Sequence, residues 1–284
     1  MAERTLAGKT MLISGGSRGI GLAIALRAAA DGANVALVAK TAEPHPKLEG
    51  TVFTAAEEIE AAGGQALPIV GDIRNEEDVA GAVAATVEKF GGIDLCVNNA
   101  SAINLSGTEA MEMKRYDLMQ DINARGTYLF SKHCIPHLKS ADNPHVLTLS
   151  PPLSLDPKWA KVHVAYTIAK YGMSLCTLGM AEEFRDDGIA FNSLWPRTLV
   201  ATAAVQNLLG GDEAMARARK PEIYSDAAHA VLTRPSRECT GNFFLCEDVL
   251  VEEGVTSFDE YAAAPGATPQ VDLYVDEVDP PGLS

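Results

Sequence analysis

Short apolar runs alternate with longer amphipathic stretches along most of the chain. The amphipathic stretches include IGLAIALRAAADG (20–32) and NEEDVAGAVAATVEKFGG (75–92), and the second begins at a capping Asn75 and ends at Gly91. Apolar runs separated by helical patterns predict buried parallel strands with helices on both faces of the sheet. We therefore expect an α/β fold, a Rossmann-type doubly wound parallel sheet of about seven strands. The expected strands are TMLISGG (10–16), NVALVAK (34–40), ALPIVGD (66–72), IDLCVNN (93–99), HVLTLS (145–150), IAFNSLW (189–195) and, more weakly, NFFLC (242–246).

The same pattern predicts how the chain is divided. Residues 1–253 are expected to form a single Rossmann-type domain, and residues 254–284 an acidic, proline-rich arm that packs in an extended form or frays. The proline-containing loop TAEPHPKLEGT (41–51) lies where the edge of a bound cofactor would be. Residues 200–220 are expected to form a mobile lid over a substrate pocket.

Composition narrows the classes of partner. The formal net charge of −15 argues against nucleic acid and anionic membranes, and 47% hydrophobic residues suffice for a buried core. The five cysteines form no CxxC pair, which favours a reducing compartment. No signal-like start and no long apolar run are seen, so we expect a cytoplasmic protein without a membrane span.

A glycine-rich loop, ISGGSRGIGLAIA (13–25), joins the first expected strand to the first expected helix. Gly15, Gly19 and Gly21 would permit a tight turn, a close approach of the backbone and close packing of helix on sheet. Free N–H groups at the start of a helix bind pyrophosphate. The loop, including Ser17 and Ile20, therefore predicts a dinucleotide site, with a plain strand-to-helix turn as the alternative.

The end of the second expected strand indicates which dinucleotide binds. NAD-binding sites of this kind use an acidic residue there to hold the ribose hydroxyls, whereas this chain has Ala39 and Lys40. Arg18 lies inside the glycine loop, and Lys40 and Arg18 could both meet a 2′-phosphate. We therefore expect NADP(H) to be favoured over NAD(H). The alternative for Lys40 is a solvated surface lysine.

Four motifs together resemble those of one enzyme family. SGGSRGIG, VNNAS (97–101), INARGTY (122–128) and YTIAK (166–170) come in the order found in the short-chain dehydrogenase/reductases, and the resemblance covers roughly residues 6 to 250. Longer stretches, such as LSPPLSLDPKW and AYTIAKYGMSLCTLGMAEEF, resemble the dehydrogenase domain of a hydroxysteroid dehydrogenase-like subgroup of this family. The resemblance implies hydride transfer between a nicotinamide cofactor and a small-molecule substrate, and a homo-oligomer (dimer or tetramer) paired through the amphipathic stretch 112–138.

The resemblance also implies the catalytic residues. Tyr166 resembles the general acid/base, Lys170 the residue that lowers its pKa and binds the nicotinamide ribose, and Asn123 the residue that helps to hold a water in the proton relay. Residues four apart share a helix face, so Tyr166 and Lys170 can converge on one pocket. A free phenol has a pKa near 10, and a nearby ammonium and an oxidised nicotinamide both favour the phenolate. The alternative is an ordinary pair on a helix surface.

Further cofactor contacts follow from the same resemblance. Asp72 resembles the acid that binds the adenine amino group and is followed by Ile73, and Asn99 resembles the cofactor-side residue after the fourth strand. The family threonine on the nicotinamide amide has two candidates here, Thr198 and Thr202.

The chain departs from the family pattern at two places. The serine expected 13 residues before the tyrosine is Leu153, and Ser154 or Ser150 could replace it, or neither; a turn or a strand end are their alternative roles. Arg197 stands where the family commonly has glycine, and it either points into the pocket toward an acidic substrate group or is a surface charge.

The resulting prediction is an NADP(H)-dependent oxidoreductase acting on a lipophilic carbonyl or alcohol. The altered serine position keeps two alternatives open: a non-catalytic cofactor-binding or scaffold protein, and an enoyl reductase or dehydratase on the same fold. His133 and His137 are spaced to share a helix face, but no third ligand is near them in the sequence, so no metal site is expected.

Overall fold

The computed structural model describes residues 4–44, 50–208 and 210–280. Its sheet has seven strands in the order β3-β2-β1-β4-β5-β6-β7, and all neighbouring strands are parallel. This confirms the expected fold class and each of the seven expected strands. The strands are β1 (Thr10–Ser14), β2 (Asn34–Ala39), β3 (Gln65–Val70), β4 (Leu95–Asn98), β5 (His145–Thr148), β6 (Ala190–Trp195) and β7 (Phe243–Leu245).

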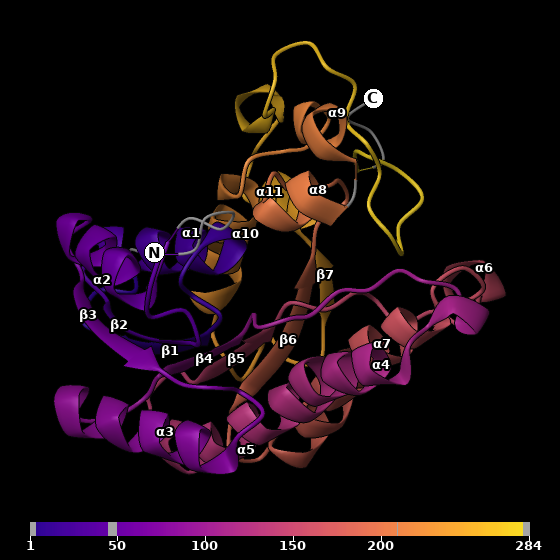
Figure 1. The fold of residues 1–284 in the computed structure, drawn as a ribbon. Helices are drawn as coiled ribbons and strands as arrows, with labels where there is room; N and C mark the ends of the chain where they lie inside the picture. The colour runs from indigo at the N-terminus through magenta and orange to yellow at the C-terminus, as the bar shows by residue number, and fades with distance from the viewer. Residues whose placement is uncertain (1–3, 45–49, 209, 281–284) are drawn as a thin grey trace.

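Helices cover both faces of the sheet (Figure 1). One layer consists of α1 (Gly19–Ala30), α2 (Val52–Ala61), α10 (Glu222–Leu232) and α11 (Cys246–Glu252). The other consists of α3 (Glu76–Phe90), α4 (Met113–Gln120), α5 (Gly126–Leu138) and α7 (Val164–Glu183). Shorter helices lie outside these layers: α6 (Pro157–Ala160), α8 (Ala203–Leu208) and α9 (Gly211–Ala216).

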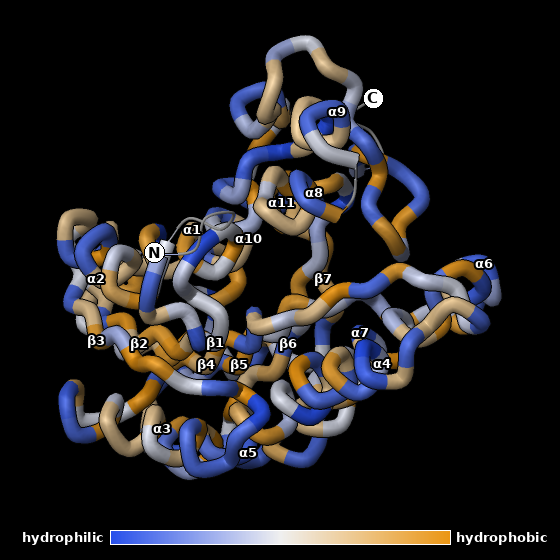
Figure 2. Tube along the Cα trace, in the orientation of Figure 1, coloured by the Kyte–Doolittle hydropathy of each residue, from blue (hydrophilic) through white to orange (hydrophobic). Residues whose placement is uncertain are grey.

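The strands are apolar over nearly their whole length, and they run through the middle of the molecule in Figure 2. Because the inner strands β1, β4, β5 and β6 are covered on both sides, their residues are buried on both faces of the pleat, whereas the edge strands β3 and β7 are partly exposed. The chain order reverses between β1 and β4, which is the point where doubly wound sheets bind their ligands, outside the carboxyl ends of the strands. The predicted site residues can therefore be sought at that end.

The long amphipathic stretch 112–138 is not one regular helix. A π-helical segment, Asp121–Arg125, separates α4 from α5. The wider π turn moves the residues after it around the helix axis, so a single helical periodicity cannot describe both halves. Asn123, a predicted site residue, lies in the middle of this segment.

The carboxyl end of the sheet is covered by two segments. Helices α8 and α9 form the region expected to be a lid. The arm that follows α11 returns across this end, where Thr198 and Val271 form an antiparallel bridge. Figure 1 shows this arm reaching from the α8–α9 region down toward α6 and α7. In the described ranges, no helix has the length and apolar character needed to cross a membrane.

Candidate active site

The glycine loop between β1 and α1 is packed too closely for larger residues. Gly15 has a positive φ of 71°, and a Cβ at Gly21 would lie 2.5 Å from the Asn99 side-chain nitrogen. Asn99 donates from Nδ2 to the carbonyl oxygens of Ser14 and Gly15, at 2.9 and 2.8 Å. The amide thus fixes the loop in the shape that presents the start of α1. These features fit the cradle that a dinucleotide pyrophosphate requires.

Two cations, on Arg18 and Lys40, lie where the sequence predicts the 2′-phosphate of a dinucleotide. Arg18 donates from Nη2 to the Gly50 carbonyl at 2.8 Å, and its Nε is buried without a partner among the described residues. Lys40 follows β2, is more than half exposed, and its Nζ lies 3.7 Å from Asp72 Oδ2. The buried Nε and the exposed ammonium are both available to an anion. His45 and Lys47, in the loop expected at the cofactor edge, lie outside the described residues.

Asp72 is engaged more fully than the sequence suggested. Arg74 forms a two-pronged ion pair with it, with Nη2 at 2.6 Å from Oδ2. This hydrogen bonding lowers the pKa of Asp72 to about 2. A carboxylate has roughly four lone-pair sites, and Arg74 and Lys40 take up most of them. An adenine amino group would have to share or displace Arg74, so the adenine contact of Asp72 stays a prediction, as does that of the neighbouring Ile73.

Tyr166 and Lys170 are brought together on the buried face of α7. Their exposed fractions are 5% and 3%. Lys170 donates from Nζ to the Leu149 carbonyl at 2.7 Å, and the same nitrogen lies 5.1 Å from the centroid of the Trp195 ring. Burial lowers the pKa of Lys170 to about 7. A pair on a helix surface is thereby excluded.

The environment of the Tyr166 phenol differs from expectation. Burial raises its pKa well above the ordinary value, with smaller contributions from Tyr274 and Asp272. Lys170 does not offset this effect of burial, and its ammonium is hydrogen-bonded to the Leu149 carbonyl, so the lowering expected with a bound nicotinamide stays a prediction. Within the described part of the chain, the Tyr166 hydroxyl makes no hydrogen bond. The protein therefore presents a neutral phenol, a proton donor.

Asn123 lies in the π-helical segment against α7. It is fully buried, its Oδ1 accepts from the Ala102 N–H at 2.7 Å, and its Nδ2 donates to the Ala102 carbonyl at 3.0 Å. The side chain therefore ties the loop after β4 to the segment that faces Tyr166 and Lys170. π segments are frequent at functional sites.

Neither serine near position 153 bonds to Tyr166. Ser150 is fully buried, and its Oγ lies 2.9 Å from Ser193 Oγ on β6. Ser154 accepts from the Asp156 N–H at 3.2 Å in an exposed loop, which is the turn role considered as its alternative. This arrangement does not favour the catalytic role expected for Ser154, and that role stays a prediction.

In the segment after β6, the position of Thr198 fits its predicted role, whereas that of Arg197 does not. Thr198 is fully buried, and its Oγ1 has no partner within the described ranges, which fits a hydrogen bond to a nicotinamide amide. Both roles considered for Arg197 were wrong. Its guanidinium is largely buried and engaged, because it forms an ion pair with the partly exposed Asp248 of α11 at 2.9 Å and donates to the Glu277 carbonyl at 3.4 Å.

The carboxyl-terminal arm supplies residues that sequence reasoning missed. The Tyr274 ring stacks on Tyr166 with 6.5 Å between centroids, and its hydroxyl lies 3.1 Å from Thr167 Oγ1. Asp272 precedes it, and burial raises the pKa of Asp272 to about 7. The sequence left open whether the arm packs in an extended form or frays; its interspersed apolar residues, as in VDLYV (271–275), were the signal that it packs.

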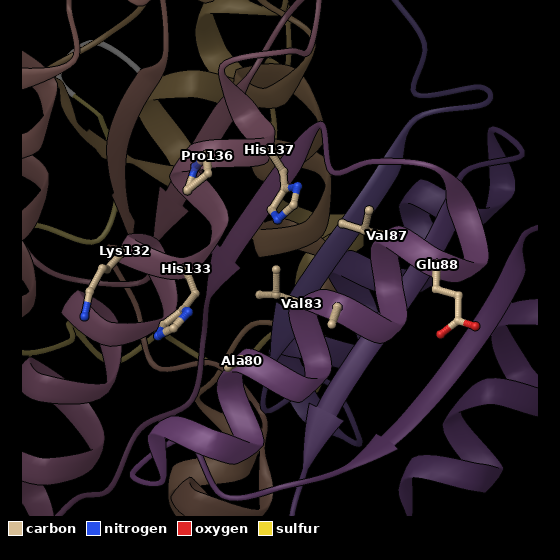
Figure 3. Close-up of a pocket in the computed structure, with 9 residues that line it drawn as sticks. Ala80, Val83, Val87, Glu88, Lys132, His133, Pro136 and His137 are labelled. Carbon is tan, nitrogen blue, oxygen red and sulfur yellow. The ribbon is translucent and has the colours of Figure 1, made fainter.

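A surface groove of about 670 Å³ lies elsewhere, between α3 and α5. Figure 3 shows His133 and His137 of α5 across from Val83 and Val87 of α3. Lys132 and His133 contact Glu76 there. None of the predicted cofactor or catalytic residues lines this groove. Among the described residues, no group of three or more metal-ligating side chains is found.

Known proteins resemble this chain over nearly its whole length. Hydroxysteroid dehydrogenase-like protein 2 from Danio rerio is 59% identical over 271 residues, which cover 95% of this chain and 65% of the relative. The Homo sapiens protein of that name is 55% identical over 272 residues, 96% of this chain and 64% of the relative. The chain thus spans about two thirds of the length of these curated relatives.

Solved structures and a family model agree with these relatives. The crystal structure of a short chain dehydrogenase from Mycobacterium thermoresistibile matches with a TM-score of 0.94 at 68% identity, over 99% of both chains. That of a dehydrogenase from Xanthomonas campestris matches with a TM-score of 0.93 at 55% identity, over 96% of this chain and 100% of the other. The model of the short chain dehydrogenases matches residues 9–211. This chain therefore belongs to the short-chain dehydrogenase/reductase family of oxidoreductases.

Proposed function

We propose that this protein is an NADP(H)-dependent oxidoreductase that interconverts a lipophilic carbonyl compound and its alcohol, with Tyr166 as the acid/base. The observation that carries the proposal is the buried Tyr166–Lys170 pair, together with a glycine loop and a Thr198 hydroxyl that has no partner among the described residues. Arg18 and Lys40 support the preference for a 2′-phosphate, since no acid ends β2.

The side chains of the cleft divide the work. A bound nicotinamide would supply or accept the hydride. Tyr166 donates its phenolic proton to the carbonyl oxygen as the alcohol forms, and its neutral state suits that direction. Lys170, held by the Leu149 carbonyl, keeps a cation within reach of the phenolate that remains. The aromatic rings around Tyr274 exclude water and offer an apolar surface to the substrate.

Removing the phenolic proton donor tests this proposal. With NADPH and a panel of ketones and aldehydes, Tyr166→Phe should lower kcat by about 100-fold or more, because general acid catalysis is lost. Tyr128→Phe, at an exposed position on α5, is the matched control and should keep the parent rate. Turnover by Tyr166→Phe as fast as the parent would show that another group supplies the proton. NADPH binding without turnover of any carbonyl by the parent would favour a non-catalytic cofactor-binding protein.

We also propose that the protein forms a homo-oligomer in which α7, and not the stretch 112–138 alone, contacts a second copy. The support is a row of exposed apolar side chains on the outer face of this helix, Ile168, Leu175 and Leu178. Monomeric proteins rarely leave such a row uncovered.

A further inference from the structure

We propose that Asp272 replaces the missing serine as a hydrogen-bond donor to the reacting oxygen of the substrate, beside the hydroxyl of Tyr166. This inference rests on the proposed function, since it concerns the same reacting oxygen. A second hydrogen-bond donor to this oxygen has to come from another residue, because Leu153 occupies the serine position and Ser150 is hydrogen-bonded to Ser193. Ser154 is engaged in a turn.

The arm is held firmly on both sides of Asp272. Before it, the Leu199 N–H donates to the Gln270 carbonyl, and the Asp272 N–H itself donates to the Arg197 carbonyl, both at 3.0 Å. After it, Arg219 donates from Nη1 to the Val278 carbonyl at 3.2 Å. The residues between these anchors therefore have a defined position across the segment that follows β6.

The same residues reach the catalytic side chains. Trp195 donates from Nε1 to the Leu273 carbonyl at 2.8 Å, and the Tyr274 ring stacks on Tyr166. Asp272 lies near enough for its charge to act on the pKa values of both Tyr166 and Lys170. Tyr274 has a positive φ of 70°, which is costly for a residue with a side chain. The surrounding contacts enforce this strained turn, and the turn places the arm against Tyr166.

The two oxygens of the Asp272 carboxyl group have different surroundings. The Leu273 N–H donates to Oδ1 at 2.7 Å, so Oδ1 must be an acceptor, and the proton of the neutral acid is left on Oδ2. In the described ranges Oδ2 has no hydrogen-bond partner, and Asp272 is partly exposed. Enough protein surrounds the group for burial to raise its pKa to about 7. A carboxylic acid kept neutral in this way can donate a hydrogen bond.

The proposed role leaves the proton balance of the reaction unchanged. In carbonyl reduction the hydride joins the carbonyl carbon, and the Tyr166 proton joins the oxygen. Asp272 keeps its own proton and only donates a hydrogen bond while negative charge develops on that oxygen. Donors placed in this way stabilise the transition state.

Two substitutions at one position separate donation from charge. Asp272→Ala removes the donor and should lower kcat by about 100-fold, as for an oxyanion-hole donor. Asp272→Asn should keep most of the rate, because Leu273 fixes the amide oxygen and turns the NH₂ group into the place of Oδ2. Asp276→Ala is the matched control in the same arm, since the Asp276 side chain is 69% exposed and, among the residues that the structure describes, pairs with Lys158 alone. Thermal melting curves of all three variants establish that they are folded.

The pH dependence gives an independent readout. Parent activity should fall as the pH rises through 7, because ionised Asp272 cannot donate and repels the developing charge. Lys170 loses its charge in the same pH range, so any decrease in activity with pH that remains in Asp272→Asn is caused by Lys170. The ionisable groups that face Asp272 are Tyr166 and Lys170 of α7, Tyr224 of α10, Cys246 and Glu247 of α11, and Tyr274 of the arm.

A binding measurement tests Asp272 without turnover. The two tryptophans of the chain, Trp159 and Trp195, both pack on Tyr274, so their fluorescence reports on ligands in this cleft. With NADP⁺ present, 2-decanone cannot be reduced. The affinity of the parent for 2-decanone should fall about fivefold between pH 6 and pH 8.5, because one hydrogen bond is lost, whereas the affinity of Asp272→Asn should stay the same.

A parent that binds the ketone with this pH dependence but never reduces a carbonyl would refute the proposed function and leave the Asp272 site standing. Equal binding by parent and Asp272→Asn at both pH values, or full activity of Asp272→Ala, would overturn the inference.

Discussion

Burial shifts the pKa values of Lys170 and Asp272 toward each other. The lysine falls to about 7 and the aspartic acid rises to about 7. The unfolded chain would keep Lys170 protonated up to about 10.5, so between pH 7 and 10.5 stability rises with pH on account of this residue. Folded Asp272 keeps its proton longer than the unfolded chain does, so from about pH 4 to 7 this residue makes stability fall as pH rises. Both residues are thus less charged at neutral pH than their types suggest.

The preference between the two nicotinamide dinucleotides can be tested at a single residue. Lys40→Asp should weaken NADPH binding about tenfold or more and shift the preference toward NADH, because the new carboxylate repels a 2′-phosphate and can accept from ribose hydroxyls. Isothermal titration with each cofactor measures this. Lys132→Asp is the matched control, because Lys132 is similarly exposed and ion-paired but lies on α5. Unchanged NADPH affinity in Lys40→Asp would remove Lys40 from the phosphate site.

Among the elements, α7 and the π-helical segment must approach closely for the site to assemble. Tyr166 and Lys170 lie on α7, and Asn123 lies on the segment that packs against it. The approach depends on Gly172, where a Cβ would lie only 2.7 Å from the Ala124 Cβ. The packing of these two elements therefore fixes the geometry of all three predicted catalytic residues.

Two glycines in the interiors of helices provide a matched test of that packing. Gly172→Ala should destabilise the protein by about 1–2 kcal/mol, because overpacking outweighs the better helix propensity of alanine. It should also lower kcat by moving Tyr166 away from Asn123. Gly81→Ala, on an exposed part of α3 with nothing within 4 Å of its Cβ position, should gain about 0.5–1 kcal/mol. Urea unfolding measures both changes. A stabilised Gly172→Ala variant would mean that the two elements can separate without cost.

Sequence reasoning succeeded where the signal was local. The strands follow from apolar runs, and the start of α3 at Asn75 and its end at Gly91, with φ 87°, follow from capping chemistry. The π-helical segment could not be predicted, because an amphipathic pattern does not show that one turn contains an extra residue. The positions of Asp272 and Tyr274 also could not be read, since they depend on pairing with a segment more than 70 residues earlier in the chain.

At the scale of the whole molecule, the arm and the sheet are joined through two buried arginines. Arg219 pairs with Glu247 of α11 at 2.6 Å and with Asp279 of the arm at 2.5 Å, while Arg197 joins Asp248 to the arm backbone. Breaking a buried pair leaves an uncompensated charge, so these contacts couple the position of the arm to the packing of α11. The site thereby depends on segments from both ends of the fold: the glycine loop near the start of the chain and the arm at its far end.

The outer face of α7 connects the site to the assembly of the protein. Ile168, Leu175 and Leu178 are 47, 57 and 49% exposed, and their spacing places them in one row on the helix. Covering them in a second copy would stabilise the contact by about 0.8–1.5 kcal/mol per leucine, because about half of each side chain is still exposed, whereas a glutamate there would bring an unpaired charge into the contact. We therefore expect the parent to sediment as a dimer or tetramer and the variant carrying Leu175→Glu and Leu178→Glu to dissociate at least about 100-fold more readily. Phe53→Glu is the control, because Phe53 is also 49% exposed but lies on α2, on the other side of the sheet. If dissociation also lowers kcat, the cause is structural, since Tyr166 and Lys170 occupy the inner face of the same helix and the partner would hold that helix in place. A parent that sediments as a single chain, or a double variant with unchanged mass, would contradict assembly through α7.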